Sequence, residues 1–273
     1  MGIHVRTLDP WFVCQKRNPS ARVRLFCIPY AGGAANIYRK WSESLGEIVE
    51  VWAIEPPGRG SRLRETPFTT LPELVQNLGP AFRSYLDKPF AFFGHSMGAI
   101  ISFELARYLR RARLRNPMHL FVSGCRALQL PDPRPPTYDL PEAQFMEELR
   151  RLNGTPGDVL DHPEMMEFIL PLLRADFALA QTYEYSDEPP LDCPITAFGG
   201  FQDEEMNRAS VEAWQAQTTC AFASYMLPGD HFFLDSSRAA LLEVLARELG
   251  RTVNGSTPVD MGLASLKSAG ATS

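Results

Sequence analysis

The chain has 273 residues, of which 45% are hydrophobic and 22% charged, an ordinary balance for a globular protein with a sizeable core. Its formal net charge of −5 argues against a nucleic-acid-binding surface, which is cationic. The five cysteines form no CxxC pair, so we expect reduced thiols and no disulfide framework. The N-terminus lacks the apolar run of a signal peptide, and no long uncharged apolar stretch occurs. We therefore expect a cytoplasmic protein that has no membrane partner.

Short apolar runs that end at glycine or proline alternate with helical patterns along the chain. A lead-in of about 20 residues is expected to pack Trp11 or Phe12 on the core. The predicted strands cover 23–29, 49–55, 90–93, 119–123, 195–198 and 223–227, and the predicted helices 37–46, 70–86, 97–111 and 237–250. Apolar strands separated by helices predict the α/β class, with a mostly parallel sheet covered by helices on both faces.

One connection is far longer than the others. Roughly 65 residues separate the strand at 119–123 from the strand at 195–198, many more than an ordinary connection needs. We interpret residues 127–190 as a helical lid, with helices near 142–153 and 163–185, inserted into a single domain over 1–251. The small polar residues of 252–273 predict a disordered tail.

Residues 94–98 (GHSMG) fit the pattern G-x-S-x-G, with a predicted strand before them and a predicted helix after them. In hydrolases this tight turn lifts the serine oxygen above the carboxyl edge of the sheet. The following helix adds partial positive charge where an oxyanion forms. A chance glycine-serine turn is the alternative, and it does not explain the flanking strand and helix. Ser96 is the predicted nucleophile.

The base and the acid follow from chain order, which in such hydrolases runs Ser, acid, His. His231 follows the last predicted strand in 228–231 (PGDH), whereas His95 lies inside the turn and should point away from the site. Asp203 follows the strand at 195–198 and is the predicted acid. Asp230 can hardly reach behind the ring of its neighbour, so we expect it to have a turn role. Glu204 and Glu205 are the adjacent alternatives, expected to be solvated.

An oxyanion hole requires two donors, and backbone N–H groups supply them. The N–H of Met97, next to the nucleophile, is the first, and that of Ala31, in the glycine-rich loop 29–33, is the second. No GxGxxG or GK[ST] pattern supports phosphate binding by that loop. We expect no metal and no bound cofactor.

With these residues placed, the chain resembles the type II thioesterases that serve polyketide and nonribosomal peptide synthases, within the α/β-hydrolase superfamily. The resemblance covers about 20–250 and rests on several motifs: 26–33 (FCIPYAGG), 57–60 (PGRG) with Arg62, 94–98, 172–176 (LLRAD) and 228–233 (PGDHFF). The family usually has glycine where Asp230 stands. The resemblance implies hydrolysis of acyl groups from the phosphopantetheine arm of acyl or peptidyl carrier proteins, either to edit stalled chains or to release a product. The partner is then a transiently bound carrier, and we expect the enzyme to be a monomer.

Three further residues are candidates for substrate binding: Tyr30, Arg59 and Arg62. The two arginines follow a strand's carboxyl end, where they would steer an acidic carrier or its phosphate, and a structural ion pair is an equal alternative. The arginines at the end of helix 97–111 lie roughly 20 Å from Ser96, because each helical residue rises 1.5 Å. We expect them to offset the helix dipole only.

Two rival activities fit the same triad. A carboxylesterase or small lipase would hydrolyse simple esters, and an acyltransferase would pass the acyl group to an alcohol or an amine. A binding module on an inactive scaffold would require a broken triad, and this triad is complete.

Overall fold

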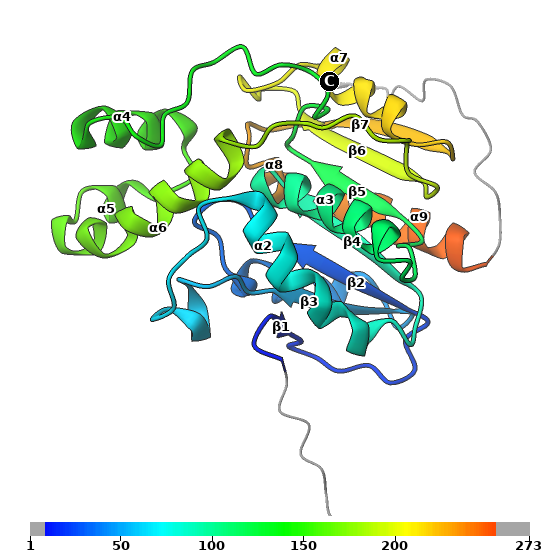
Figure 1. The fold of residues 1–273 in the computed structure, drawn as a ribbon. Helices are drawn as coiled ribbons and strands as arrows, with labels where there is room; N and C mark the ends of the chain where they lie inside the picture. The colour runs from blue at the N-terminus through cyan, green and yellow to red at the C-terminus, as the bar shows by residue number, and fades with distance from the viewer. Residues whose placement is uncertain (1–8, 255–273) are drawn as a thin grey trace, which may run out of the picture.

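The computed structural model describes residues 9–254, which form a seven-stranded sheet with helices around it (Figure 1). The strand order is β1-β3-β2-β4-β5-β6-β7; β1 pairs antiparallel with β3, and all the other pairs are parallel. The strands are β1 (Phe12–Val13), β2 (Val23–Ile28), β3 (Val49–Ile54), β4 (Phe90–His95), β5 (Leu120–Ser123), β6 (Ile195–Gly200) and β7 (Phe222–Leu227). The predicted α/β class with a mostly parallel sheet is confirmed.

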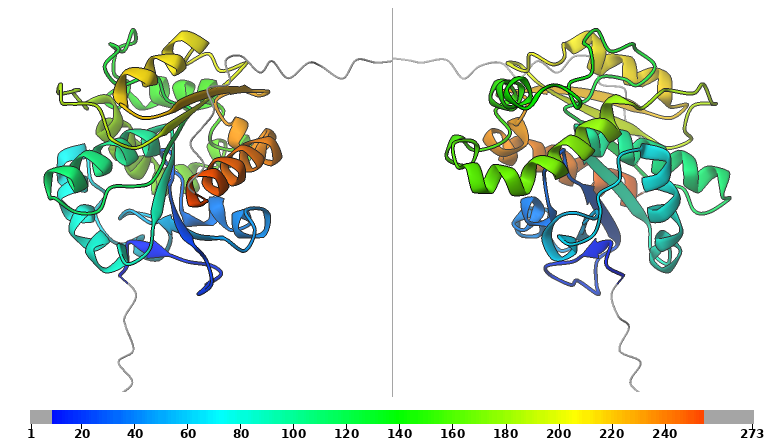
Figure 2. Two further views of the ribbon diagram at one scale, coloured as in Figure 1. Left: turned by 90° about the vertical axis from the view of Figure 1, so that its right-hand side faces the viewer. Right: turned by 60° about the vertical axis from the view of Figure 1, so that its left-hand side comes forward.

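Helices cover both faces of the sheet, as the edge-on view in Figure 2 shows, with α2 and α3 on one face and α1 and α9 on the other. The α-helices are α1 (Trp41–Ser44), α2 (Leu71–Leu78), α3 (Met97–Arg111), α4 (Glu142–Leu152), α5 (Gly157–Leu160), α6 (Pro163–Gln181), α7 (Arg208–Glu212), α8 (Phe233–Ser236) and α9 (Arg238–Val253). Short 3₁₀ segments are η1 (Ala35–Tyr38), η2 (Gly60–Arg62), η3 (Gly79–Tyr85) and η4 (Ala213–Gln217). Within residues 9–254, no helix is both long and apolar enough to cross a membrane.

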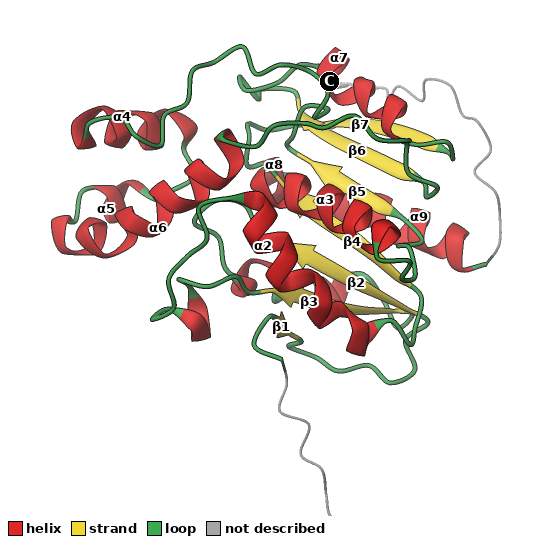
Figure 3. Ribbon diagram, in the orientation of Figure 1, coloured by secondary structure: helices red, strands yellow, loops and turns green. Residues whose placement is uncertain are grey.

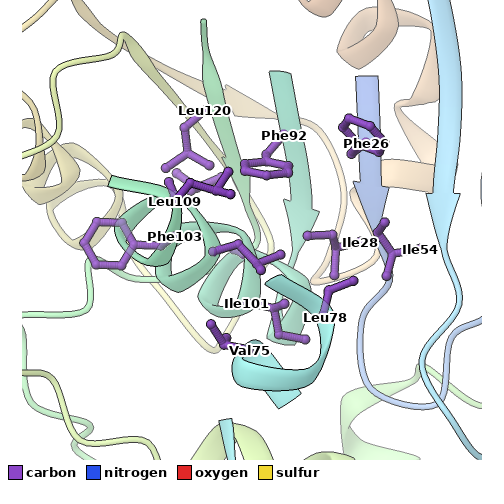
Figure 4. Close-up of a cluster of buried hydrophobic side chains, with 14 of the residues drawn as sticks. Phe26, Ile28, Ile54, Val75, Leu78, Phe92, Ile101, Phe103, Leu109 and Leu120 are labelled. Carbon is purple, nitrogen blue, oxygen red and sulfur yellow. The ribbon is translucent and has the colours of Figure 1, made fainter. Parts of the chain in front are cut away.

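The core consists of two clusters because successive strand residues point to opposite faces of the sheet. In β4, Phe90 and Phe92 pack with α2 and α3, whereas Ala91 and Phe93 pack with α1 and α9. Figure 4 shows part of the first cluster, where strand residues such as Phe92 meet side chains of α2 and α3. Trp11 and Phe12 are both buried, as the lead-in prediction requires.

Some predicted helices are shorter or more broken than expected. The helix expected over 70–86 is α for eight residues and then 3₁₀, since Pro80 cannot donate the next backbone hydrogen bond. The helix expected over 37–46 is divided between η1 and α1. The predicted tail starts at 252, but α9 continues to Val253, and residues 255–273 lie outside the described part of the chain.

The helices α4, α5 and α6 all lie between β5 and β6 in the chain, and Figures 1 and 3 show them grouped beside the sheet. We call residues 127–190 the cap. It has a small core of its own, made of Phe145, Leu149, Leu160, Met166 and Leu173. Its two long helices match the predicted positions closely.

Candidate active site

Ser96 occupies the turn between β4 and α3 with φ 53° and ψ −118°, a conformation that is rare for any residue except glycine. The flanking glycines make this turn possible. A Cβ atom on Gly94 would lie 2.0 Å from the carbonyl oxygen of Gly98, and one on Gly98 would lie 2.2 Å from that of Ile28. The G-x-S-x-G spacing is therefore a packing requirement, and it places Ser96 at the N-terminus of a 15-residue helix.

The structure brings His231 and Asp203 together from the loops after β7 and β6. His231 Nδ1 lies 2.9 Å from Asp203 Oδ2, and the Asp203 side chain is fully buried. Because a carboxylate only accepts, Nδ1 carries the proton, which leaves Nε2 of His231 available as a base. His231 and Ser96 line the same cavity.

The other candidate acids and bases have other partners. Asp230 accepts hydrogen bonds from the N–H of Phe232 at 2.9 Å and from Asn153 Nδ2 at 3.2 Å, so it is a turn residue, as predicted, and it also contacts the cap. His95 is fully buried below the turn, where its Nδ1 lies 2.9 Å from the Ser123 hydroxyl. Burial, reinforced by the nearby His231, lowers the pKa of His95 well below its ordinary value. Glu205, expected to be solvated, is mostly shielded and bound by arginines.

Met97 and Ala31, the two predicted oxyanion donors, line the cavity beside Ser96. Met97 is the first residue of α3, so its N–H has no partner within the helix. In the loop after β2, the N–H of Gly32 donates to Asp176 Oδ2 at 2.7 Å, and that of Gly33 donates to the carbonyl of Tyr30 at 2.9 Å. The loop is thus fixed around Ala31. No hydrogen bond from the Ala31 N–H is found among residues 9–254.

A cavity of about 690 Å³ begins at these residues and extends beneath the cap. Tyr30, Ser96 and His231 line it. The cap contributes charged side chains such as Arg134, Glu148 and Arg151, and the apolar side chains Leu149, Leu152, Leu173, Phe177 and Ala180. Among residues 9–254, no group of three or more His, Cys, Asp or Glu side chains is placed to hold a metal ion.

Arg59 and Arg62 do not line this cavity, in contrast to Tyr30. Arg59 is 4% exposed and forms two hydrogen bonds to Asp176, at 2.7 and 2.8 Å. Arg62 binds Glu65 and lies over the Trp11 ring, 4.2 Å from its centroid. Both arginines therefore form structural ion pairs, which was the alternative interpretation. Their geometry does not support a role in substrate binding.

Asp176 is a site-supporting residue that the sequence did not assign. It lies in α6 of the cap, and its carboxylate joins Arg59 to the backbone of the oxyanion loop at Gly32. Its motif was visible in 172–176, but a carboxylate within an apolar helix gives no indication of its partner, which is 117 residues away. Breaking a buried pair of this kind costs about 3–5 kcal/mol.

The family model of the thioesterase domain matches residues 23–249. The chain belongs to the thioesterase family. The gramicidin S biosynthesis protein GrsT of Aneurinibacillus migulanus is 46% identical over 245 residues, which cover 90% of this chain and 96% of GrsT.

Solved structures give the same result. The RedJ thioesterase of the prodiginine pathway in Streptomyces coelicolor is 40% identical, with a TM-score of 0.79, over 85% of this chain and 87% of RedJ. The type II thioesterase BorB of the borrelidin biosynthetic cluster is 34% identical, with a TM-score of 0.81, over 88% of this chain and 98% of BorB. The predicted resemblance to type II thioesterases is confirmed, and the protein is an enzyme that hydrolyses thioesters.

Proposed function

We propose that this thioesterase removes acyl groups from the phosphopantetheine arm of acyl or peptidyl carrier proteins. The observation that carries the proposal is that Ser96, His231, Met97 and Ala31 line one cavity together with apolar side chains of the cap. An acyl chain is accommodated beneath the cap, while the reactive carbonyl lies at Ser96. Relatives named for gramicidin S biosynthesis and for the borrelidin biosynthetic cluster support a role beside polyketide or nonribosomal peptide synthases.

In the proposed reaction, Ser96 Oγ attacks the thioester carbonyl carbon while His231 Nε2 accepts its proton. The oxyanion receives hydrogen bonds from the N–H groups of Met97 and Ala31, and the N-terminus of α3 adds favourable charge. The intermediate collapses, the C–S bond breaks, and the sulfur leaves with the proton from His231. Water then attacks the acyl-enzyme by the same route, with Asp203 holding the imidazole orientation throughout.

The test compares one acyl group on three scaffolds: a carrier's phosphopantetheine, a small thiol and a simple alcohol. Mass spectrometry of the carriers before and after incubation measures the release of the acyl group, with the Ser96→Ala variant as the negative control. We expect the carrier-bound thioester to give the highest kcat/KM. Faster turnover of the oxygen ester would favour a carboxylesterase, and an acylated alcohol or amine product would favour an acyltransferase.

A further inference from the structure

Glu205 joins the cap to the loop that carries Asp203. Its carboxylate binds two arginines of the cap: Arg151 of α4, with Nη1 at 2.8 Å from Oε1, and Arg134 of the proline-rich linker 131–136 (PDPRPP), which precedes α4. The Glu205 side chain is only 12% exposed. A carboxylate shielded from water and held by two guanidinium groups forms stronger hydrogen bonds than an exposed surface pair.

The same residue also supports the acid of the triad. The backbone N–H of Glu205 donates to Asp203 Oδ1 at 2.8 Å, while Asp203 Oδ2 lies 2.9 Å from His231 Nδ1. The two oxygens of Asp203 are thus held from opposite sides. Any movement of Glu205 moves the donor that orients this carboxylate.

Arg151 is itself held in place for this contact. It binds Glu148, one turn earlier in α4, through Nε at 2.8 Å and Nη2 at 2.6 Å, and this leaves Nη1 to reach Glu205. Both Glu148 and Arg151 line the cavity. α4 is therefore linked to the imidazole through two residues: Glu205, bound at its carboxylate and its backbone N–H, and Asp203, bound at both carboxylate oxygens.

We infer that Glu205 is a positioning residue that couples the closed position of the cap to the orientation of the triad. When α4 and the linker rest on the loop after β6, Arg134 and Arg151 fix Glu205, and its N–H holds Asp203 against His231. When the cap lifts, both ion pairs break and Asp203 loses this support. Hydrolysis is then fastest with the cap closed over the acyl chain. This inference rests on the proposed use of Asp203 as the acid.

The test uses Glu205→Gln and Arg151→Gln in the full-length enzyme, with Arg150→Gln as the matched control. Arg150 is the neighbouring arginine of α4, and it pairs with Asp161 inside the cap at 3.3 Å. The substrate is an acyl thioester of N-acetylcysteamine, so no carrier is needed. Steady-state rates are measured across pH, and proton NMR follows the His231 ring N–H that faces Asp203.

We expect both test variants to lower kcat by roughly 10-fold to 10²-fold, since a small misplacement of a catalytic group has effects of this size. KM should change less than about two-fold, because the apolar side chains that line the cavity are unchanged and each substitution replaces one polar side chain with another. The acid limb of the pH–rate profile should move to lower pH, because a poorly placed carboxylate stabilises the imidazolium less. Combining the two substitutions should add little to Glu205→Gln alone, and Arg150→Gln should match the wild type.

An unchanged acid limb and NMR resonance in Glu205→Gln would overturn the inference, whatever happens to the melting temperature. Equal losses in all three variants would do the same, because they would reflect a general weakening of the cap. If Glu205→Gln does not fold, Arg151→Gln alone decides, since that residue is half-exposed on the cap. Wild-type enzyme that cleaves the small thioester but no carrier-bound one contradicts the proposed function and leaves this test intact.

Discussion

At the scale of single residues, the backbone of Ser96 is held in an unfavourable conformation by the structure around the turn. A positive φ at a residue other than glycine costs free energy, of order 1–3 kcal/mol, and persists where the surroundings enforce it. The serine hydroxyl is not part of the packed core that enforces this positive φ. Replacing the side chain should therefore change chemistry and leave the fold intact.

Ser96→Ala should lose activity by about 10⁴-fold or more, because the members of a triad act as a unit. Its melting temperature should stay close to that of the wild type, and labelling by a fluorophosphonate should disappear. The measurements are hydrolysis of an acyl thioester, thermal unfolding and gel detection of the probe. A folded variant that kept more than a few per cent of its activity would remove Ser96 from the mechanism.

Asp203 and Asp230 provide a matched pair of carboxylates near one histidine. Asp203→Asn should lower kcat by roughly 10²–10⁴-fold, because an amide favours the wrong imidazole tautomer. Asp230→Asn keeps an oxygen for the N–H of Phe232 and should affect kcat little. Steady-state kinetics of both variants at one pH decide the matter. The opposite ranking would transfer the acid role to Asp230.

At the scale of elements, the cap divides into parts that are anchored to different degrees. The second half of α6 is held by the buried pair of Asp176 and Arg59. The segment between α6 and β6 is held at Glu188, which binds three arginines of α3: Arg107, Arg110 and Arg111. These arginines, expected only to offset a dipole, therefore fasten the end of the cap. The end of α4 contacts the sheet domain through Arg151 and Asn153, and both of these side chains are themselves exposed to water.

Hydrogen exchange should therefore be fastest in α4 and α5, over 142–160, and slow in 173–181, in contrast to a lid that moves as one unit from 127 to 190. Exposed contacts open with less free energy than buried ion pairs. A non-hydrolysable acyl-carrier analogue should slow exchange in α4 and α5 specifically. Mass spectrometry of exchange with and without the analogue measures this. Protection in α4 equal to that of β4 would make the cap a fixed wall.

The cavity-facing side of α6 is defined by Leu173, Phe177 and Ala180, which recur at helical spacing. Two cap methionines of α6, Met165 and Met166, do not line the cavity: Met165 is 45% exposed, and Met166 is buried in the core of the cap. Ala180→Phe should narrow the cavity and move the chain-length optimum to shorter acyl groups. Met165→Phe, on the outer face, is the control. Identical profiles across a series of acyl thioesters would show that Ala180 does not limit chain length.

The sequence predicted the long elements and the candidate triad residues because each leaves a local signal: an apolar run that ends at glycine for β4, period 3.6 for α3, and chain order for Ser96 and His231. It missed the two-residue strand β1 and the short helix α7, which are too brief to show a period. It also missed the partners of Arg59 and Glu205. Those are set by tertiary packing between segments far apart in the chain, and no local pattern encodes them.

At the scale of the whole molecule, buried histidines connect stability to pH. His119 lies in the core next to β5, stacked 4.1 Å from the Phe121 ring and 2.8 Å from the hydroxyl oxygen of Thr196. Burial lowers its pKa to about 3, against 6.5 for the ordinary group. The folded protein therefore keeps this ring neutral at pH values where the unfolded chain protonates it.

This difference fixes the sign of the pH dependence. Below about pH 6.5 the unfolded state binds a proton that the folded state does not, so the contribution of His119 to stability is complete above pH 6.5 and is lost as pH falls toward 3. Each pH unit within that window lowers the free energy of unfolding by about 1.4 kcal/mol for this group. His95, whose pKa is also lowered by burial, adds in the same direction.

His119→Gln should remove the His119 part of this slope while keeping a donor for Thr196. The variant should be less stable at pH 8, because it loses the ring stacked on Phe121, yet its free energy of unfolding should fall less steeply between pH 6.5 and 5. Urea unfolding at half-unit pH steps measures both slopes. His162→Gln, at an exposed histidine before α6, is the control and should keep the wild-type slope. Parallel curves for His119→Gln and the wild type would mean that the acid sensitivity of the fold arises elsewhere.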